Sequence, residues 1–391
     1  MTIYLDNAGT KKPDEKIAGD YLNLIKKSYG NSSSLHSHGR EMSKILENCR
    51  EKIACLFSVE PDIVYFNSGA SEGNNTILKG MVDYALFYKT IGKKLPHLII
   101  SSIEHPSIIE SAKILHNHKR AEVTFIHPEK DGLFKPEKII DSIKAETILI
   151  SVGFVNNETG VVQDVKKIGR ELKKYKSSIG AKYPYLHTDI TQAIEYNTIN
   201  LERDLIDIVT FSGHKFGSLP GTGVLISKTD KFFPLISGGG QEMDKRSGTV
   251  DVYGIYYLVK VLENIAQKRI KNTKILQHKK GKLEQGIEKI EGAKILFKNS
   301  PRSPHISLIA LKNIEHQNLF VILDKQKISV SIGSACASKS QKISYVLKNM
   351  QVDAKTIRET LRISIALATS NNEIEAFLKI LAKIYADYQG R

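Results

Sequence analysis

Short apolar runs alternate with amphipathic stretches between residues 62 and 227. Along the chain the runs read IVYF, HLIIS, VTFI, TILISV, YLHTD, IDIVTF and GVLIS. Helical patterns such as HPSIIESAKILHNH and DVKKIGRELKKY lie between several of them, and hairpin signals are scarce. Buried β-branched strands that alternate with helices are typical of an α/β domain. We therefore predict a mostly parallel sheet of seven strands.

A glycine-rich segment, SGGGQEMDKRSGT, ends this pattern. Residues 253–291 then have the composition of a long helix, rich in Lys, Leu and Ile, that joins two lobes. The apolar runs HISLIAL and ISVSIGSA follow, with helical patterns around them and a final helix, NEIEAFLKILAKIYADY. We predict a large α/β domain over residues 14–255 and a smaller α+β domain formed by residues 1–13 and 256–391.

The bulk composition fits a folded protein of this size. The 391 residues are 41% hydrophobic and 25% charged, which is ordinary for globular proteins and enough for two cores. The longest apolar runs fall far short of the roughly 20 residues that cross a bilayer. The beginning, MTIYLDNAGT, lacks the basic start and apolar stretch of a signal peptide. We expect a cytoplasmic protein with no membrane association.

The three cysteines and the net charge exclude several kinds of site. Cys49, Cys55 and Cys336 form no CxxC pair, which argues against a disulfide framework and against a metal site. The net charge of +15 is spread along the chain without interleaved aromatic residues, so no direct nucleic-acid role is expected. An acidic protein partner fits this charge. Cys336 differs from the other two cysteines because the segment around it, SVSIGSACASKS, consists mostly of small side chains and cannot build a hydrophobic core.

Polar residues follow the predicted strands, and in open α/β sheets ligands bind at the carboxyl ends of strands. The segment NSGASEGNN after IVYF offers free N–H groups and a hydroxyl to an anion such as phosphate, although plain helix capping gives the same pattern. His105 follows HLIIS, Asn157 follows TILISV, and Asp189 and Gln192 close YLHTDITQ. Each of these has an ordinary structural explanation when it is considered alone.

Lys215 is the lysine that follows a strand, in SGHK after IDIVTF, beside Ser212 and His214. A lysine forms a Schiff base when burial or nearby cations lower its pKa. Together the strand ends supply a phosphate cradle, a ring platform, a carboxylate for a pyridinium nitrogen, donors for a phenolic oxygen, and an amine. Those groups match the needs of pyridoxal 5′-phosphate.

Ten motifs in order resemble those of the cysteine desulfurases, which are fold type I pyridoxal-phosphate enzymes of the class V aminotransferase group. The motifs are YLDNAGT, SSSLHSHG, NSGASEGNN, SSIEHPS, NNETG, HTDITQA, SGHKFG, GGGQEMDKRSGT, GSACAS and LRIS. The resemblance covers nearly the whole chain. The length between Cys336 and the next predicted helix, ISYVL, resembles the long-loop, NifS- and IscS-like branch of the family.

The resemblance implies how the cofactor is held. Lys215 would carry pyridoxal 5′-phosphate covalently. The backbone of Ala70 and the side chains of Ser71, Ser212 and His214 would hold its phosphate.

Further contacts follow from the same resemblance. His105 would stack on the ring, and Asp189 would pair with the pyridine nitrogen. Asn157 and Gln192 would lie near the substrate and the phenolic oxygen. Thr249, in RSGT, would reach the phosphate of a neighbouring subunit, which implies a homodimer with shared active sites.

The resemblance also implies the reaction. L-cysteine would become L-alanine, and its sulfur would remain on Cys336 as a persulfide, with Lys215 and His105 as the other catalytic residues. Arg362, in LRIS, would bind the substrate carboxylate. The persulfide would then pass to an acceptor protein, such as an iron–sulfur scaffold or a thiolation enzyme, which the sequence does not identify.

Two alternatives remain at this stage. The first is another enzyme of the same fold, such as a selenocysteine lyase or an aminotransferase. Cys336 argues against the aminotransferase, whereas the residues would serve selenocysteine equally well. The second is a non-enzymatic scaffold, which would not need Lys215, Asp189 and Arg362 together. The chain also has Ala366 and Leu367 where the family commonly has Gly-Arg.

Overall fold

The computed structural model describes residues 2–333 and 343–389. Its main element is a seven-stranded sheet in the order β2-β8-β7-β6-β5-β3-β4. The strands are β2 (Val64–Asn67), β3 (His97–Ser101), β4 (Glu122–Ile126), β5 (Thr147–Ser151), β6 (Tyr185–Asp189), β7 (Ile208–Ser212) and β8 (Gly223–Ser227). Strand β8 runs antiparallel to both neighbours, and all other pairs are parallel. The predicted mostly parallel sheet of seven strands is therefore confirmed.

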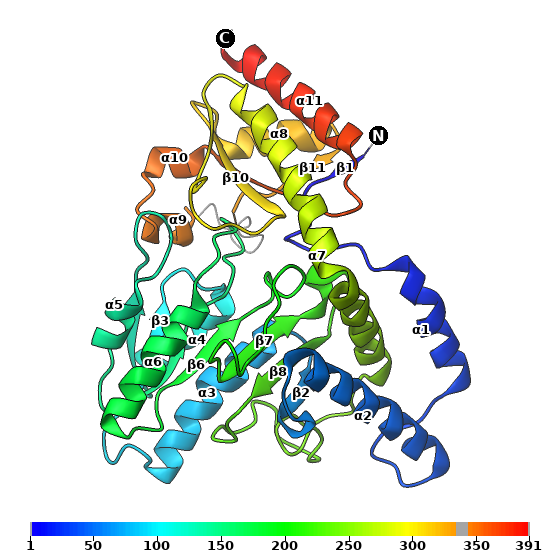
Figure 1. Ribbon diagram of the computed structural model, residues 1–391, viewed down its shortest axis with the longest axis vertical. Coiled ribbons are helices and arrows are strands. Elements are labelled where there is room, and N and C mark those ends of the chain that lie inside the picture. Colours follow the sequence, from blue (N-terminus) through cyan, green and yellow to red (C-terminus); the bar gives the residue numbers. More distant parts are fainter. Residues whose placement is uncertain (1, 334–342, 390–391) are drawn as a thin grey trace.

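Helices cover both faces of this sheet (Figure 1). The helices in this part of the chain are α1 (Glu15–Lys27), α2 (Ser37–Phe57), α3 (Ala70–Tyr88), α4 (Pro106–Asn117), α5 (Pro136–Asp141) and α6 (Val165–Ile179), with the 3₁₀ turns η1 (Pro61–Ile63) and η2 (Gly213–Phe216). Successive strand residues point to opposite faces, so Leu98 belongs to a hydrophobic cluster with residues of α3 and α4, whereas Ile99 belongs to another cluster, which includes residues of α2 and α6. This two-sided burial explains why the strands are apolar runs without alternation.

A second, smaller set of strands lies beyond the sheet (Figure 1). Strand β10 (Ile306–Leu311) pairs antiparallel with β12 (Thr360–Ser364) and β9 (Ala293–Ile295), and β1 (Ile3–Tyr4) pairs parallel with β11 (Ile328–Ser329). The helices here are α8 (His316–Lys325), α9 (Tyr345–Asn349), α10 (Ala354–Arg358) and α11 (Asn371–Gln389). We call the seven-stranded sheet with α1–α6 the large lobe, and these later elements with β1 the small lobe.

The long helix α7 (Val252–Glu288) joins the lobes, close to the predicted range of 253–291. Its first half packs Leu258 and Leu262 into the core of the large lobe. Its second half packs Leu276 and Leu283 into a separate core, which also holds Leu5 from the start of the chain. Figure 1 shows α7 running from one lobe to the other. Among the described residues, no helix is both long enough and apolar enough to span a membrane.

Candidate active site

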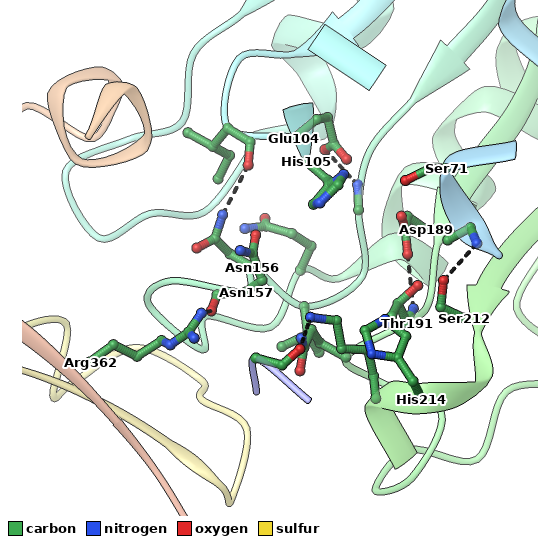
Figure 2. A pocket seen from close by; sticks show the side chains of 18 of the residues that line it. Ser71, Glu104, His105, Asn156, Asn157, Asp189, Thr191, Ser212, His214 and Arg362 are labelled. Atoms are coloured by element: carbon green, nitrogen blue, oxygen red, sulfur yellow. Dashed lines mark hydrogen bonds between the residues drawn. The ribbon is translucent and has the colours of Figure 1, made fainter. Parts of the chain in front are cut away.

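A cavity of about 290 Å³ lies at the carboxyl ends of β3, β5, β6 and β7, and Arg362 of the small lobe reaches it from the other side (Figure 2). Ten residues singled out from the sequence line it: Ala70, Ser71, His105, Asn157, Asp189, Gln192, Ser212, His214, Lys215 and Arg362. Thr249 does not line it. Cys336 lies outside the described residues. The fold therefore brings the strand-end residues together around one space, as the topology of a parallel sheet requires.

The N-terminus of α3 opens into this cavity. Gly69 precedes the helix with φ 149° and, having no side chain, cannot cap the helix itself. The N–H of Ala70 donates to Ser212 Oγ at 2.7 Å, and a Cβ on Gly69 would stand 3.1 Å from that oxygen. The other N–H groups of the first turn and the helix dipole favour an anion at this place, and Ser71 and His214 lie beside it.

Asp189, the last residue of β6, is held with its carboxylate fixed. Its Oδ2 accepts from Asn74 Nδ2 at 3.0 Å, and its Oδ1 accepts from the Thr191 N–H at 2.9 Å. Asn74 is fully buried in α3 and was not singled out from the sequence, although NSGASEGNN contains it. A fixed carboxylate of this kind suits a protonated ring nitrogen.

His105 caps the start of α4. Its Nδ1 accepts from the Ser107 N–H at 3.2 Å. Burial lowers the pKa of His105; the Asp189 carboxylate opposes this effect and the Lys215 amine adds to it. The imidazole is therefore a neutral, apolar-faced ring at neutral pH, which suits stacking.

Lys215 lies in η2 directly after β7. Its Nζ donates to the carbonyl of Ala8 at 3.0 Å and to the carbonyl of Gly9. The segment after β1 thus forms part of the wall around the amine. Burial, together with the Lys215 charge, lowers the pKa of the neighbouring His214 to about 4.

Arg362 approaches from β12 and is only 2% exposed. Its Nη1 donates to the carbonyl of Asn157 at 2.8 Å, and its Nη2 pairs with Asp6 Oδ1 at 2.6 Å (Figure 2 shows the first contact). Among the described residues its buried Nε has no hydrogen-bond partner. A buried guanidinium with an unused donor at a cavity is suited to a carboxylate ligand. Asp6 was not singled out from the sequence, although it is the acid of YLDNAGT.

Glu104 is a further lining residue that the sequence reasoning missed. It is 5% exposed, and its Oε1 accepts from the Gly153 N–H at 2.7 Å. Burial raises the pKa of Glu104 to about 7. The hydrogen bond from Gly153 lowers this pKa, and the nearby charge of Asp189 raises it by a smaller amount. Its position next to His105 in SSIEHPS was the available signal.

Comparisons with known proteins agree with this geometry. The family model for aminotransferase class-V matches residues 3–377. Cysteine desulfurase IscS of Clostridium botulinum (strain Kyoto) is 34% identical over 389 residues, covering 98% of this chain and 94% of the relative. Cysteine desulfurase IscS of Methanosarcina thermophila is 31% identical over 383 residues, covering 98% of this chain and 91% of the relative.

Solved structures are similar along the same length. A structure described as a NifS-like protein is 29% identical and has a TM-score of 0.89. The match covers 99% of this chain and 100% of the other chain. A structure described as SspA in complex with cysteine is 26% identical and has a TM-score of 0.80. The match covers 94% of this chain and 100% of the other chain. This chain therefore belongs to the class-V aminotransferase family and, within it, to the cysteine desulfurases.

Proposed function

We propose that this chain uses pyridoxal 5′-phosphate to convert L-cysteine to L-alanine and keeps the released sulfur as a persulfide on Cys336. The observation that carries the proposal is the cavity itself. There the amine of Lys215, the fixed carboxylate of Asp189 and the buried guanidinium of Arg362 face one space. The solved relative described as a complex with cysteine supports the choice of substrate.

The residues present fit the cofactor that enzymes of this family use. The N-terminus of α3, with Ser71 and Ser212, would hold the phosphate. Asp189 would hold a proton on the ring nitrogen, and His105 would lie against the ring. When bound, the cofactor supplies an aldehyde for amines and a ring that withdraws electrons from the substrate α-carbon.

The chain's own residues then divide the remaining work. Arg362, fixed by Asp6 and the Asn157 carbonyl, would bind the substrate carboxylate and set the orientation of its sulfur. The Lys215 amine would accept and return the α-proton. The Cys336 thiolate would form a bond to the substrate sulfur while the Cβ–S bond breaks. The electron pair of that bond stays with the carbon fragment, which is protonated to alanine.

Three residues that do not line the cavity support a homodimer. Thr249 is exposed and does not line the cavity of its own chain, which supports a role at the active site of a second subunit. The large apolar side chains of Tyr29 (63% exposed) and Leu35 (88% exposed) support the presence of such a subunit.

We also propose the domain boundaries of the chain, its cellular location and the kind of protein that accepts its sulfur. The place of Ile3 and Leu5 in the core of the small lobe supports a small domain of residues 1–13 and 256–391 beside a large domain of residues 14–255. We propose a cytoplasmic location, where thiols stay reduced and Cys336 can recycle. An acceptor protein, such as an iron–sulfur scaffold or a thiolation enzyme, would take the sulfur.

The proposed function is tested with purified protein, L-cysteine and a thiol reductant. The wild-type protein is expected to be yellow and to release sulfide and alanine in equal amounts. Cys336→Ser should keep the colour and release no sulfide, because it loses only the sulfur acceptor. Cys55→Ser is the matched control, since Cys55 is exposed and far along the chain from the site, and it should behave as wild type. Normal sulfide release by Cys336→Ser would refute the persulfide step.

A further inference from the structure

His305 makes a hydrogen bond between the two lobes at the edge of the cavity. It directly precedes β10 in the small lobe and is 5% exposed. Its Nε2 lies 3.1 Å from Oε1 of Gln192, which follows β6 in the large lobe and lines the cavity. His305 itself does not line the cavity, so any effect on chemistry must pass through Gln192.

The contacts of Gln192 fix the orientation of its side-chain amide. Its other end lies 3.0 Å from the carbonyl oxygen of Ala8. Since a carbonyl oxygen only accepts, the amide NH₂ must face Ala8, and the amide oxygen must therefore face His305. That oxygen also only accepts, so His305 Nε2 must carry the proton.

The surroundings of His305 support this tautomer. Its Nδ1 is hydrogen-bonded to Ser303 Oγ, and a ring that donates from Nε2 accepts at Nδ1. Burial lowers the pKa of His305 well below its usual range, and the positive charges of Lys11, Lys280 and Arg362 add to this effect. The ring is therefore neutral across the physiological range, with one donor and one acceptor, and both are used.

The carbonyl of Ala8 connects this arrangement to the amine of the site. It accepts from Gln192 Nε2 and also from Lys215 Nζ, each at 3.0 Å. The amide nitrogen of Gln192 has a second hydrogen, for which the described residues offer no acceptor. We propose that His305 is a positioning residue, which holds the Gln192 amide so that this N–H is presented to the cavity beside Lys215. This proposal rests on the proposed function, because it assumes that an oxygen of the bound cofactor lies within reach of that N–H.

A purely structural explanation is the alternative to be tested. The His305 ring lies 4.6 Å from the Tyr196 ring, centroid to centroid, and could serve as packing alone. His305→Phe keeps an aromatic ring against Tyr196 but removes the donor to Gln192. The positioning role therefore predicts a change at Gln192, whereas the packing role predicts a change in thermal stability alone.

The first measurement is a crystal structure of His305→Phe, which is informative whether or not a cofactor binds. The Gln192 side chain is expected to rotate and to leave the Ala8 carbonyl. A Gln192 side chain that stays in place, with its bond to Ala8 unchanged, would overturn the proposal. Failure of wild-type protein to bind the cofactor would contradict the proposed function instead, and this structure would still decide the role of His305.

The second measurement is a double-mutant cycle with Gln192→Leu, using the visible absorption maximum of the bound cofactor and kcat/KM for L-cysteine. Loss of one hydrogen bond predicts a fall in kcat/KM of about two- to tenfold for His305→Phe. The same substitution is expected to change neither quantity in the Gln192→Leu background, although it lowers Tm in both. Equal effects in the two backgrounds would show that His305 does not act through Gln192.

Further variants protect the test against a folding failure. His305→Asn is too short to reach Gln192 and should behave like His305→Phe. His305→Gln keeps an N–H donor of similar reach and should restore most of the activity and the wild-type absorption maximum. His316→Phe, in α8 of the small lobe, is the matched control and should change neither quantity. Loss in His305→Gln equal to that in His305→Phe would contradict the proposal.

Discussion

The Arg362 guanidinium is almost fully buried, and its positive charge is compensated by the Asp6 carboxylate and by a hydrogen bond to the Asn157 carbonyl. Asp6 and Arg362 are 356 residues apart in sequence, and a β-bridge between Asp6 and Ser364, the last residue of β12, brings them together. The guanidinium is thereby fixed in direction before any substrate arrives, so less rotamer entropy is lost when a carboxylate binds.

Arg362→Ala should therefore weaken substrate binding more than turnover. Loss of a charge-assisted pair costs about 1.5–3 kcal/mol, which corresponds to a fall in kcat/KM of about 10- to 150-fold, mostly through KM. Steady-state kinetics with L-cysteine measures this change. Arg358→Ala, at an exposed position in α10, should show wild-type kinetics. An unchanged KM in Arg362→Ala would mean that another group binds the carboxylate.

Glu104 predicts a pH dependence of stability. Its pKa is raised from 4.5 to about 7, so the folded protein favours the protonated carboxyl. The stabilisation is fully present below pH 4.5 and is lost as the pH rises to 7, with a difference of up to about 3 kcal/mol. Glu104→Gln should match the wild-type Tm near pH 4.5 and exceed it by a few degrees at pH 8.

Thermal unfolding at several pH values tests this prediction. Glu110→Gln, at an exposed position in α4, is the matched control and should follow the wild-type curve at every pH. A constant offset between Glu104→Gln and wild type from pH 4.5 to 8 would show that Glu104 does not titrate in this range.

At the scale of elements, the site depends on how α3 begins. Gly69 adopts φ 149°, a conformation that side chains rarely take, and Ser212 Oγ lies where a Cβ would almost touch it. The helix therefore begins close against β7 with the N–H groups of its first turn at the cavity, and a larger residue would move them.

Gly69→Ala should lower the affinity for the cofactor through its phosphate end. Displacement of the first N–H groups would cost about one hydrogen bond, roughly 0.5–1.5 kcal/mol, which predicts an affinity about two- to tenfold weaker. Equilibrium titration of the apoprotein with pyridoxal 5′-phosphate measures it. Gly19→Ala in α1, where a Cβ meets nothing within 4 Å, should leave this affinity unchanged and raise stability slightly. Equal affinity of Gly69→Ala and wild type would exclude the start of α3 as the phosphate site.

The sequence predicted elements and strand-end residues well because both are local properties. Each of the seven apolar runs became a strand, and Asp189 and Ser212 stand at the last positions of β6 and β7. Asn74, Asp6 and His305 were missed because their importance lies in contacts made across the fold. The bond of Asn74 to Asp189 spans 115 residues, and that of His305 to Gln192 spans 113.

At the scale of the whole molecule, the active site combines pieces from both lobes. Asp189 ends β6 and Lys215 follows β7 in the large lobe, whereas Arg362 comes from the small lobe and the Ala8 carbonyl from the start of the chain. Helix α7 contributes buried residues to both cores and so holds the two lobes in one arrangement. Residues at the two ends of the sequence are thus needed for one cavity.

The proposed homodimer predicts complementation between inactive subunits. Thr249→Arg should damage the site of the partner, and Lys215→Ala should damage its own site. A mixed dimer carrying one change on each subunit then keeps both defects in one site and leaves the other intact. Sedimentation should give twice the chain mass of 43.7 kDa, and mixed dimers should recover activity that neither parent has. A monomeric mass would refute shared sites.

The central claim is that the Lys215 cavity delivers substrate sulfur to Cys336. Mass spectrometry of the protein after one exposure to L-cysteine, without reductant, tests it most directly. The account predicts that the peptide containing Cys336 gains the mass of one sulfur atom in wild type, and that Lys215→Ala shows no gain. A gain that persists in Lys215→Ala, or that falls on Cys49 or Cys55 instead of Cys336, would contradict it.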